Sequence, residues 1–101
     1  MTAEWSEQAR QDLLAIFRYV AKDNPDAARR LLKRLRGTEE NVFAHPFPGR
    51  VAPEFEVANM RECILPPYRV IYQVQREAIL FLTVIHSRQQ LRGIGESSFR
   101  V

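Results

Sequence analysis

The stretch Tyr68–His86, with the sequence YRVIYQVQREAILFLTVIH, decides the fold because it reads as two β-strands joined by a tight turn. The strands are expected at residues 68–75 and 78–86, and only Arg76-Glu77 separates them, which suits a two-residue hairpin. A further strand is expected just before them at Met60–Leu65, set apart by two prolines. The sequence therefore predicts three strands in succession, and the last two suit an antiparallel hairpin.

The first 45 residues have the pattern of two helices that fold back on one another. Ser6 suits the N-cap of the first helix, and Pro25 suits the first position of the second. Residues 1–5 could add an edge strand, and residues 46–59 form a connection that contains Pro and Gly. Apolar residues recur at helical spacing and form one stripe on each helix. The first stripe is Ala9, Leu13, Ile16, Phe17 and Val20, and the second is Ala28, Leu31, Leu32 and Leu35. Val42 and Phe43 could continue the second stripe beyond Gly37.

The two faces of the predicted sheet differ in how they can be covered. The helical hairpin can cover one face, and strand alternation places Tyr68, Val70 and Tyr72 there. The strand at residues 78–86 is apolar on both faces, and a strand of this kind is usually central and covered twice. The second cover is then either another part of the chain, such as the C-terminal tail, or a partner protein. Its apolar contacts are expected to be Leu80, Leu82 and Val84, with His86 at the end of the same face.

Composition narrows the class of protein. The chain has 101 residues, which suits a single domain, and a net charge of +3, which favours anionic partners only mildly. Its single cysteine allows no internal disulfide and fits a reducing cytoplasm. No signal peptide and no apolar run long enough for a membrane are expected. No Gly-rich phosphate loop or metal-ligand cluster occurs, so no cofactor and no metal are expected.

Two basic features could carry function. His86 and Arg88 follow the last strand, and Arg69 is expected on the neighbouring strand, so the three could form one cationic patch on the sheet face away from the helices. Such a patch could hold phosphate or an acidic partner segment, although solvated arginines at a strand end are the plainer interpretation. The run Arg29–Arg36 could likewise bind nucleic acid or a membrane, or could be the solvated side of a packed helix.

Taken in order, several short motifs resemble the ParE/RelE toxin superfamily. The resemblance runs from about residue 4 to residue 90 and implies an α+β fold: a short N-terminal strand, an α-helical hairpin, then a three-stranded meander (β-α-α-β-β-β), which completes an antiparallel sheet. We therefore expect a toxin domain at residues 1–90 and a C-terminal tail at residues 91–101. The motifs are Trp5-Ser6, Asp12-Leu13, Tyr19-Val20-Ala21, Asn24-Pro25-Asp26-Ala27-Ala28, Pro48-Gly49-Arg50, Arg61-Glu62, Tyr68–Val74 and Val84–Arg88.

The resemblance implies the toxin of a type II toxin–antitoxin pair, neutralised in a hetero-oligomer by a cognate antitoxin. RelE-like members cleave mRNA on the ribosome, and Arg69, His86 and Arg88 are the catalytic candidates for that reaction. The resemblance places two lysines of RelE-like members near Met60 and Glu62, where this chain has no basic residue. The tail also lacks the tyrosine that RelE-like members often have near the C-terminus. Both differences favour a ParE-like inhibitor of DNA gyrase that is not an enzyme. A non-toxic nucleic-acid-binding or interaction domain is a further alternative. Candidate residues for binding the target or the antitoxin are Arg50, Arg61, Arg69, Leu80, Leu82, Val84, His86 and Arg88.

Overall fold

A computed structural model describes residues 2–44, 50–51 and 59–86, and it confirms the predicted α+β fold. The predicted hairpin strands are present, and the turn between them closes with a hydrogen bond from Gln75 N to Ala78 O at 2.8 Å. The elements are, in chain order, β1 (Thr2–Trp5), α1 (Glu7–Ala21), α2 (Pro25–Arg36), α3 (Thr38–Ala44), β2 (Arg50–Val51), β3 (Met60–Leu65), β4 (Tyr68–Val74) and β5 (Ala78–His86).

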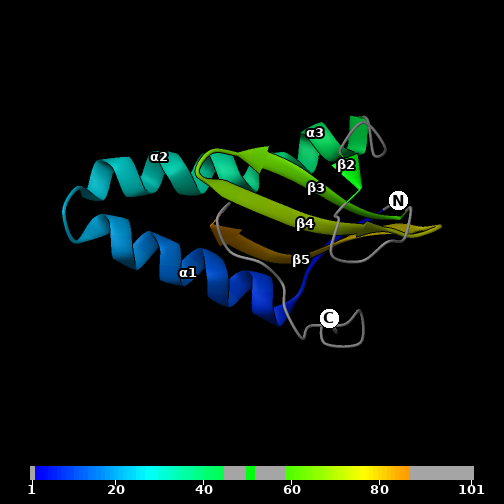
Figure 1. Cartoon of the computed structure of the whole chain (residues 1–101). Helices are drawn as coiled ribbons and strands as arrows, with labels where there is room; N and C mark the ends of the chain where they lie inside the picture. Colours follow the sequence, from blue (N-terminus) through cyan, green and yellow to red (C-terminus); the bar gives the residue numbers. More distant parts are fainter. Residues whose placement is uncertain (1, 45–49, 52–58, 87–101) are drawn as a thin grey trace.

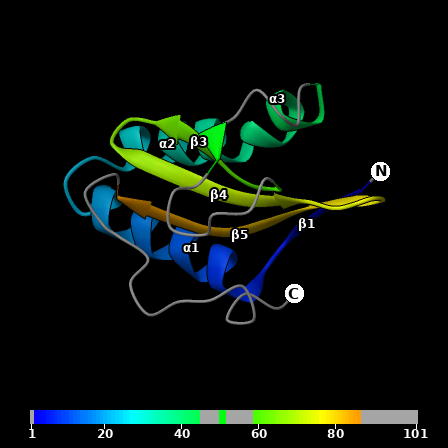
Figure 2. The same ribbon diagram turned by 45° about the vertical axis from the view of Figure 1, so that its right-hand side comes forward.

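The strands form one five-stranded sheet in the order β1-β5-β4-β3-β2. The meander β3-β4-β5 is antiparallel, as predicted, and β2 adds an antiparallel pair of residues to β3. The N-terminal strand β1 instead runs parallel to β5, so the sheet is mixed rather than antiparallel throughout. Helices α1 and α2 lie together on one side of this sheet (Figures 1 and 2).

Local capping explains where the helices begin and end. The Ser6 hydroxyl accepts a hydrogen bond from Ala9 N, and the Asn24 side chain accepts one from Ala27 N, so each of the two hairpin helices has a side-chain N-cap. Helix α2 ends at Gly37, and α3 follows as a separate short helix rather than a continuation of α2. The Thr38 hydroxyl donates to Leu35 O at 2.7 Å, which fixes this junction.

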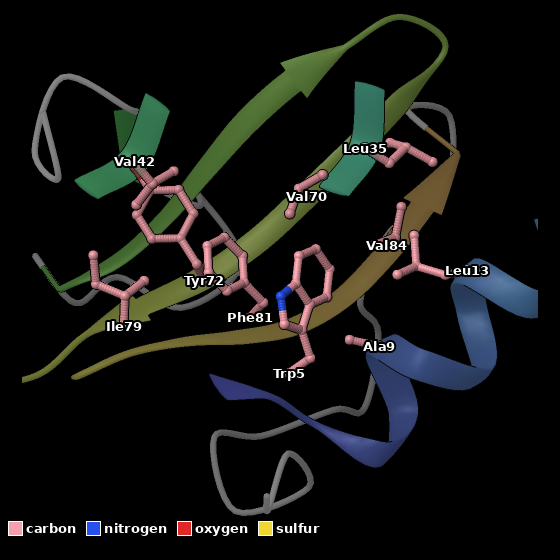
Figure 3. Close-up of a cluster of buried hydrophobic side chains, with 10 residues drawn as sticks. All are labelled: Trp5, Ala9, Leu13, Leu35, Val42, Val70, Tyr72, Ile79, Phe81 and Val84. Carbon is pink, nitrogen blue, oxygen red and sulfur yellow. The ribbon is translucent and has the colours of Figure 1, made fainter. Parts of the chain in front are cut away.

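The main core lies between the sheet and the helices (Figure 3). The indole of Trp5 stacks on the ring of Phe81 with centroids 4.5 Å apart, which joins the first strand to the last described one. Leu13 comes from α1, Leu35 from α2 and Val42 from α3, so all three helices contribute. Most residues of the predicted apolar stripes therefore pack in this core, although Phe17, Val20 and Ala28 are not among its members.

A β-bulge in β5 changes which face its last residues occupy. Ile71 pairs with Thr83 and Tyr72 pairs with Phe81, so β5 has one residue more than β4 over this interval. Strict alternation along residues 78–86 was therefore wrong beyond Leu82. Val84 packs into the helix-side core with Phe81, whereas Leu80 and Leu82 pack with Met60 and Ile71 on the opposite face.

Two other expectations concern the ends of the chain and membranes. The predicted boundary at residue 90 and the tail at residues 91–101 lie outside the described residues and stay predictions. Within the described ranges, no helix is both long enough and apolar enough to cross a lipid bilayer.

Candidate functional site

At the end of β5, side chains from Ser6 and α1 form hydrogen bonds with backbone groups that have no neighbouring β1 residue to pair with. β1 pairs with β5 only as far as Phe81, so the backbone beyond it needs other partners. The Ser6 hydroxyl donates to Leu82 O at 2.6 Å. The Asp12 carboxylate accepts hydrogen bonds from Thr83 Oγ1 and, at 2.9 Å, from Val84 N. These contacts place the bulge of β5 directly beside α1.

An open groove of about 600 Å³ lies next to this bulge, between α1 and the ends of β4 and β5. Tyr19 stands at its rim with 74% of its surface exposed, which is high for an aromatic side chain on a packed helix. Tyr68 and His86 meet edge to face across the strand pair, with ring centroids 6.0 Å apart. An apolar pocket with a few polar groups suits an anchoring side chain from a partner. The lining residues are Asp12, Ala15, Ile16, Tyr19, Tyr68, Val84 and His86.

Arg69 lies on the opposite face of the sheet, in a buried ion pair. Its Nε donates to Glu62 Oε2 at 2.7 Å, and its Nη2 lies 2.5 Å from the same oxygen. Both side chains are almost fully buried, with 7% of Arg69 and 1% of Glu62 exposed. Glu62 therefore neutralises the guanidinium that the sequence suggested for holding phosphate.

The structure separates the residues of the predicted cationic patch. His86 lines the groove on the α1 side, whereas Arg69 lies on the other face with Glu62. Arg61 is paired in register with Tyr72 of the helix-side core, so it does not share a face with Arg69 either. The expectation that Arg69 and His86 share one face was wrong because of the bulge in β5. Arg88 lies outside the described residues.

The remaining predicted binding residues differ in their accessibility. Leu80 and Leu82 are buried, with 9% and 1% exposed, although the described helices all lie on the other face. Val84 is buried but still lines the groove. Arg50 is in β2, in register with Glu62. The binding role of each of these residues stays a prediction.

Burial changes the acidity of two side chains near the middle of the sheet. It raises the pKa of the Cys63 thiol above its ordinary value. It also raises the pKa of the Tyr72 hydroxyl, which Arg61 lowers only in part. Both groups therefore stay protonated at neutral pH, and neither is activated as a nucleophile. In the part of the chain that the structure describes, no group of three potential ligands could hold a metal ion.

Three polar or aromatic residues of the groove were not assigned a binding role from the sequence: Asp12, Tyr19 and Tyr68. All three lie in motifs that carried the family resemblance, which was the available signal. These residues lie together because α1 crosses the end of β5. The position of that crossing cannot be predicted from the periodicity of a helix or a strand.

Comparison with known proteins agrees with this architecture. The family model described as "ParE toxin of type II toxin-antitoxin system, parDE" matches residues 3–91. The chain belongs to the ParE toxin family. It is therefore a toxin of a type II toxin–antitoxin system.

Two relatives that are named as toxins are similar to most of the chain. The Y4kP protein of Sinorhizobium fredii is 33% identical over 88 residues, covering 85% of this chain and 88% of that protein. Toxin RelE2 of Caulobacter vibrioides is 31% identical over 84 residues, covering 82% of this chain and 91% of that protein. Among solved structures, one described as the chromosomal ParDE TA system from P. aeruginosa has the same fold. Its TM-score is 0.69 at 24% identity, and it covers 85% of this chain and 95% of that one.

Proposed function

We propose that this ParE-family toxin inhibits DNA gyrase in the cytoplasm and is kept inactive by a cognate antitoxin. The choice of gyrase over mRNA depends on one observation, the burial of Arg69 against Glu62. A ribonuclease needs cationic groups free to stabilise phosphate in the transition state. Arg69 is neutralised, and the only described histidine, His86, lies on the other face of the sheet.

The groove beside α1 is the surface that we propose for the antitoxin. It combines an exposed aromatic, Tyr19, with an apolar floor that includes Ile16 and Val84. Asp12 and His86 add two polar groups that can orient a bound segment. A flexible antitoxin segment that orders on binding could place an apolar side chain in this groove.

The test of the target uses purified full-length toxin and purified gyrase. We expect supercoiling to fall as toxin is added, with accumulation of cleaved DNA that is released by protein denaturation. Adding the cognate antitoxin before gyrase should restore supercoiling. Unchanged supercoiling at excess toxin would contradict the gyrase proposal.

A parallel measurement addresses the mRNA alternative. Transcripts from cells that express the toxin would be mapped for new 5′ ends. Position-specific cuts that slow down in His86→Gln, together with normal gyrase activity, would replace the proposal by a ribosome-dependent nuclease. We expect intact transcripts during growth arrest.

A further inference from the structure

The solvent-exposed side of α2 carries an unusual concentration of positive charge. Residues 25–36 contain five cations and one carboxylate, a net charge of +4, whereas the whole chain carries only +3. At 100° per residue, the cations span one side of the helix, opposite the apolar stripe. We call this surface the α2 basic face; it consists of Arg29, Arg30, Lys33, Arg34 and Arg36.

Most of this charge is not neutralised by the residues that the structure describes. Arg29 pairs with Asp26, one turn earlier. The other four cations are exposed and have no ion-pair partner among the residues that the structure describes. In an ordinary solvated helix, acids and bases alternate at three- or four-residue spacing and stabilise each other.

The spacing on the α2 basic face instead puts like charges beside each other. Arg30 and Arg34 are four residues apart, and Lys33 and Arg36 are three apart. Each such pair destabilises a helix by a few tenths of a kcal/mol, roughly as much as an opposite pair stabilises it. The helix dipole favours the cations of the last turn, but Arg29 and Arg30 lie outside that turn and gain nothing from it. The arrangement therefore suits an anionic partner outside the chain.

We infer that the α2 basic face binds the phosphate backbone of double-stranded DNA without regard to sequence. The helix is about 18 Å long at 1.5 Å per residue, so its cations can follow several phosphates of a rigid duplex. Arginine, which holds phosphate with two parallel hydrogen bonds, supplies four of the five cations. This inference is independent of the gyrase proposal, although it would bring the toxin to the substrate of that enzyme.

The composition of α2 argues against other anionic polymers and surfaces. The helix has no aromatic residue on which unpaired bases could stack. Its apolar side is used in the core, where Ala28 and Leu35 are fully buried, so no apolar side remains to enter a lipid surface. Duplex DNA bound through phosphates alone needs neither feature.

The test measures binding of full-length toxin, without antitoxin, to a fluorescent DNA duplex of arbitrary sequence over a range of salt concentrations. The variant R30Q/K33Q/R34Q keeps good helix formers and removes three charges. We expect its affinity at low salt to fall at least tenfold and the slope of log K against log salt to become shallower by about 2.7, at 0.9 per lost phosphate contact. Circular dichroism would check that the variant is folded.

The matched control R18Q/K22Q/R76Q removes three exposed cations from outside α2. We expect it to bind DNA nearly as tightly as the unmodified toxin. An equal loss of affinity in both variants would show that net charge alone attracts DNA, and would overturn the inference. The inference would also fail if single-stranded DNA or a poly-glutamate peptide bound at least as tightly as the duplex. None of these outcomes bears on gyrase inhibition, which is measured separately.

Discussion

Arg69 and Glu62 form a buried ion pair between neighbouring strands, with Arg69 Nε 2.7 Å from Glu62 Oε2. The two residues are diagonal neighbours across β3 and β4, because Glu62 is in register with Ile71 and Arg69 with Ile64. Removing one partner from a buried pair leaves an uncompensated charge in a site with little water.

The first prediction concerns this pair. We expect Glu62→Gln to lower the free energy of unfolding by about 3–5 kcal/mol, because the Arg69 guanidinium loses its counter-charge. The double variant Glu62→Met/Arg69→Met should recover most of that loss, since no buried charge remains. Urea unfolding of the single and double variants measures both. A double variant that is much less stable than either single variant would argue against this account.

The second prediction concerns Asp12, whose carboxylate binds the bulge of β5. Asp12→Ala leaves the Val84 amide and the Thr83 hydroxyl without their acceptor. We expect a loss of about 2–3 kcal/mol of stability, within the range for hydrogen bonds to a charged group. Amide hydrogen exchange should speed up at Val84 more than in the middle of β4.

Gln11→Ala is the control for Asp12, because Gln11 is exposed on the same helix and its side chain donates to the exposed Glu7 carboxylate. Its effect should stay within about 0.5 kcal/mol, as for most surface substitutions. Equal effects at the two positions would show that Asp12 acts only through helix propensity.

The third prediction separates binding from stability at the groove. Tyr19 is 74% exposed, so Tyr19→Ala should change the free energy of unfolding by no more than about 0.5 kcal/mol. If Tyr19 anchors the antitoxin, its truncation should weaken antitoxin binding by at least about 2 kcal/mol, or roughly 30-fold. Titration calorimetry with the cognate antitoxin measures this affinity.

Leu14→Ala is the matched control for Tyr19. Leu14 is also an exposed apolar side chain of α1, at 47%, but it does not line the groove. The antitoxin should bind Leu14→Ala with nearly unchanged affinity. A larger loss at Leu14 than at Tyr19 would place the interface on another side of α1.

The fourth prediction concerns alkaline pH. Burial raises the pKa of the Cys63 thiol above its ordinary value of 9.0. As pH rises through that value, the unfolded chain loses its thiol proton before the folded chain does. The unfolded state then binds fewer protons, so the free energy of unfolding falls until the folded thiol also ionises. Urea unfolding at a series of alkaline pH values measures this decline.

Cys63→Ala removes the thiol and should make the alkaline decline in stability shallower. The remaining decline should include the contribution of Tyr72, whose pKa is also raised by burial. Identical pH profiles for the two proteins would mean that the thiol ionises equally easily in both states.

Local patterns in the sequence were sufficient to predict most of the elements. Ser6 and Pro25 marked the starts of α1 and α2, and the two prolines at 66 and 67 and the pair Arg76-Glu77 marked the turns of the meander. These signals succeeded because caps and tight turns depend on a few adjacent residues. The separate helix α3 was less clear, since Gly37 only weakens a helix and does not by itself end one.

The candidate site was harder to predict because it depends on long-range geometry. The bulge at Leu82 reverses the faces of Val84 and His86, and no residue type in that apolar run indicates an extra residue. The partner of Arg69 was also missed: Glu62 was considered as a residue near the position of a RelE lysine, whereas it is the counter-ion of Arg69. Strand register, which sets such diagonal pairs, follows from the whole sheet.

The parallel pairing of β1 with β5 has a consequence for the synthesis of the toxin. Trp5 needs Phe81 as its stacking partner, and the Ser6 hydroxyl needs Leu82 O, although some 76 residues separate the members of each pair. A nascent chain whose β5 is still inside the ribosome lacks the strand that Trp5 and Ser6 contact. Translation products that end before β5 should therefore fail to fold and should be readily degraded.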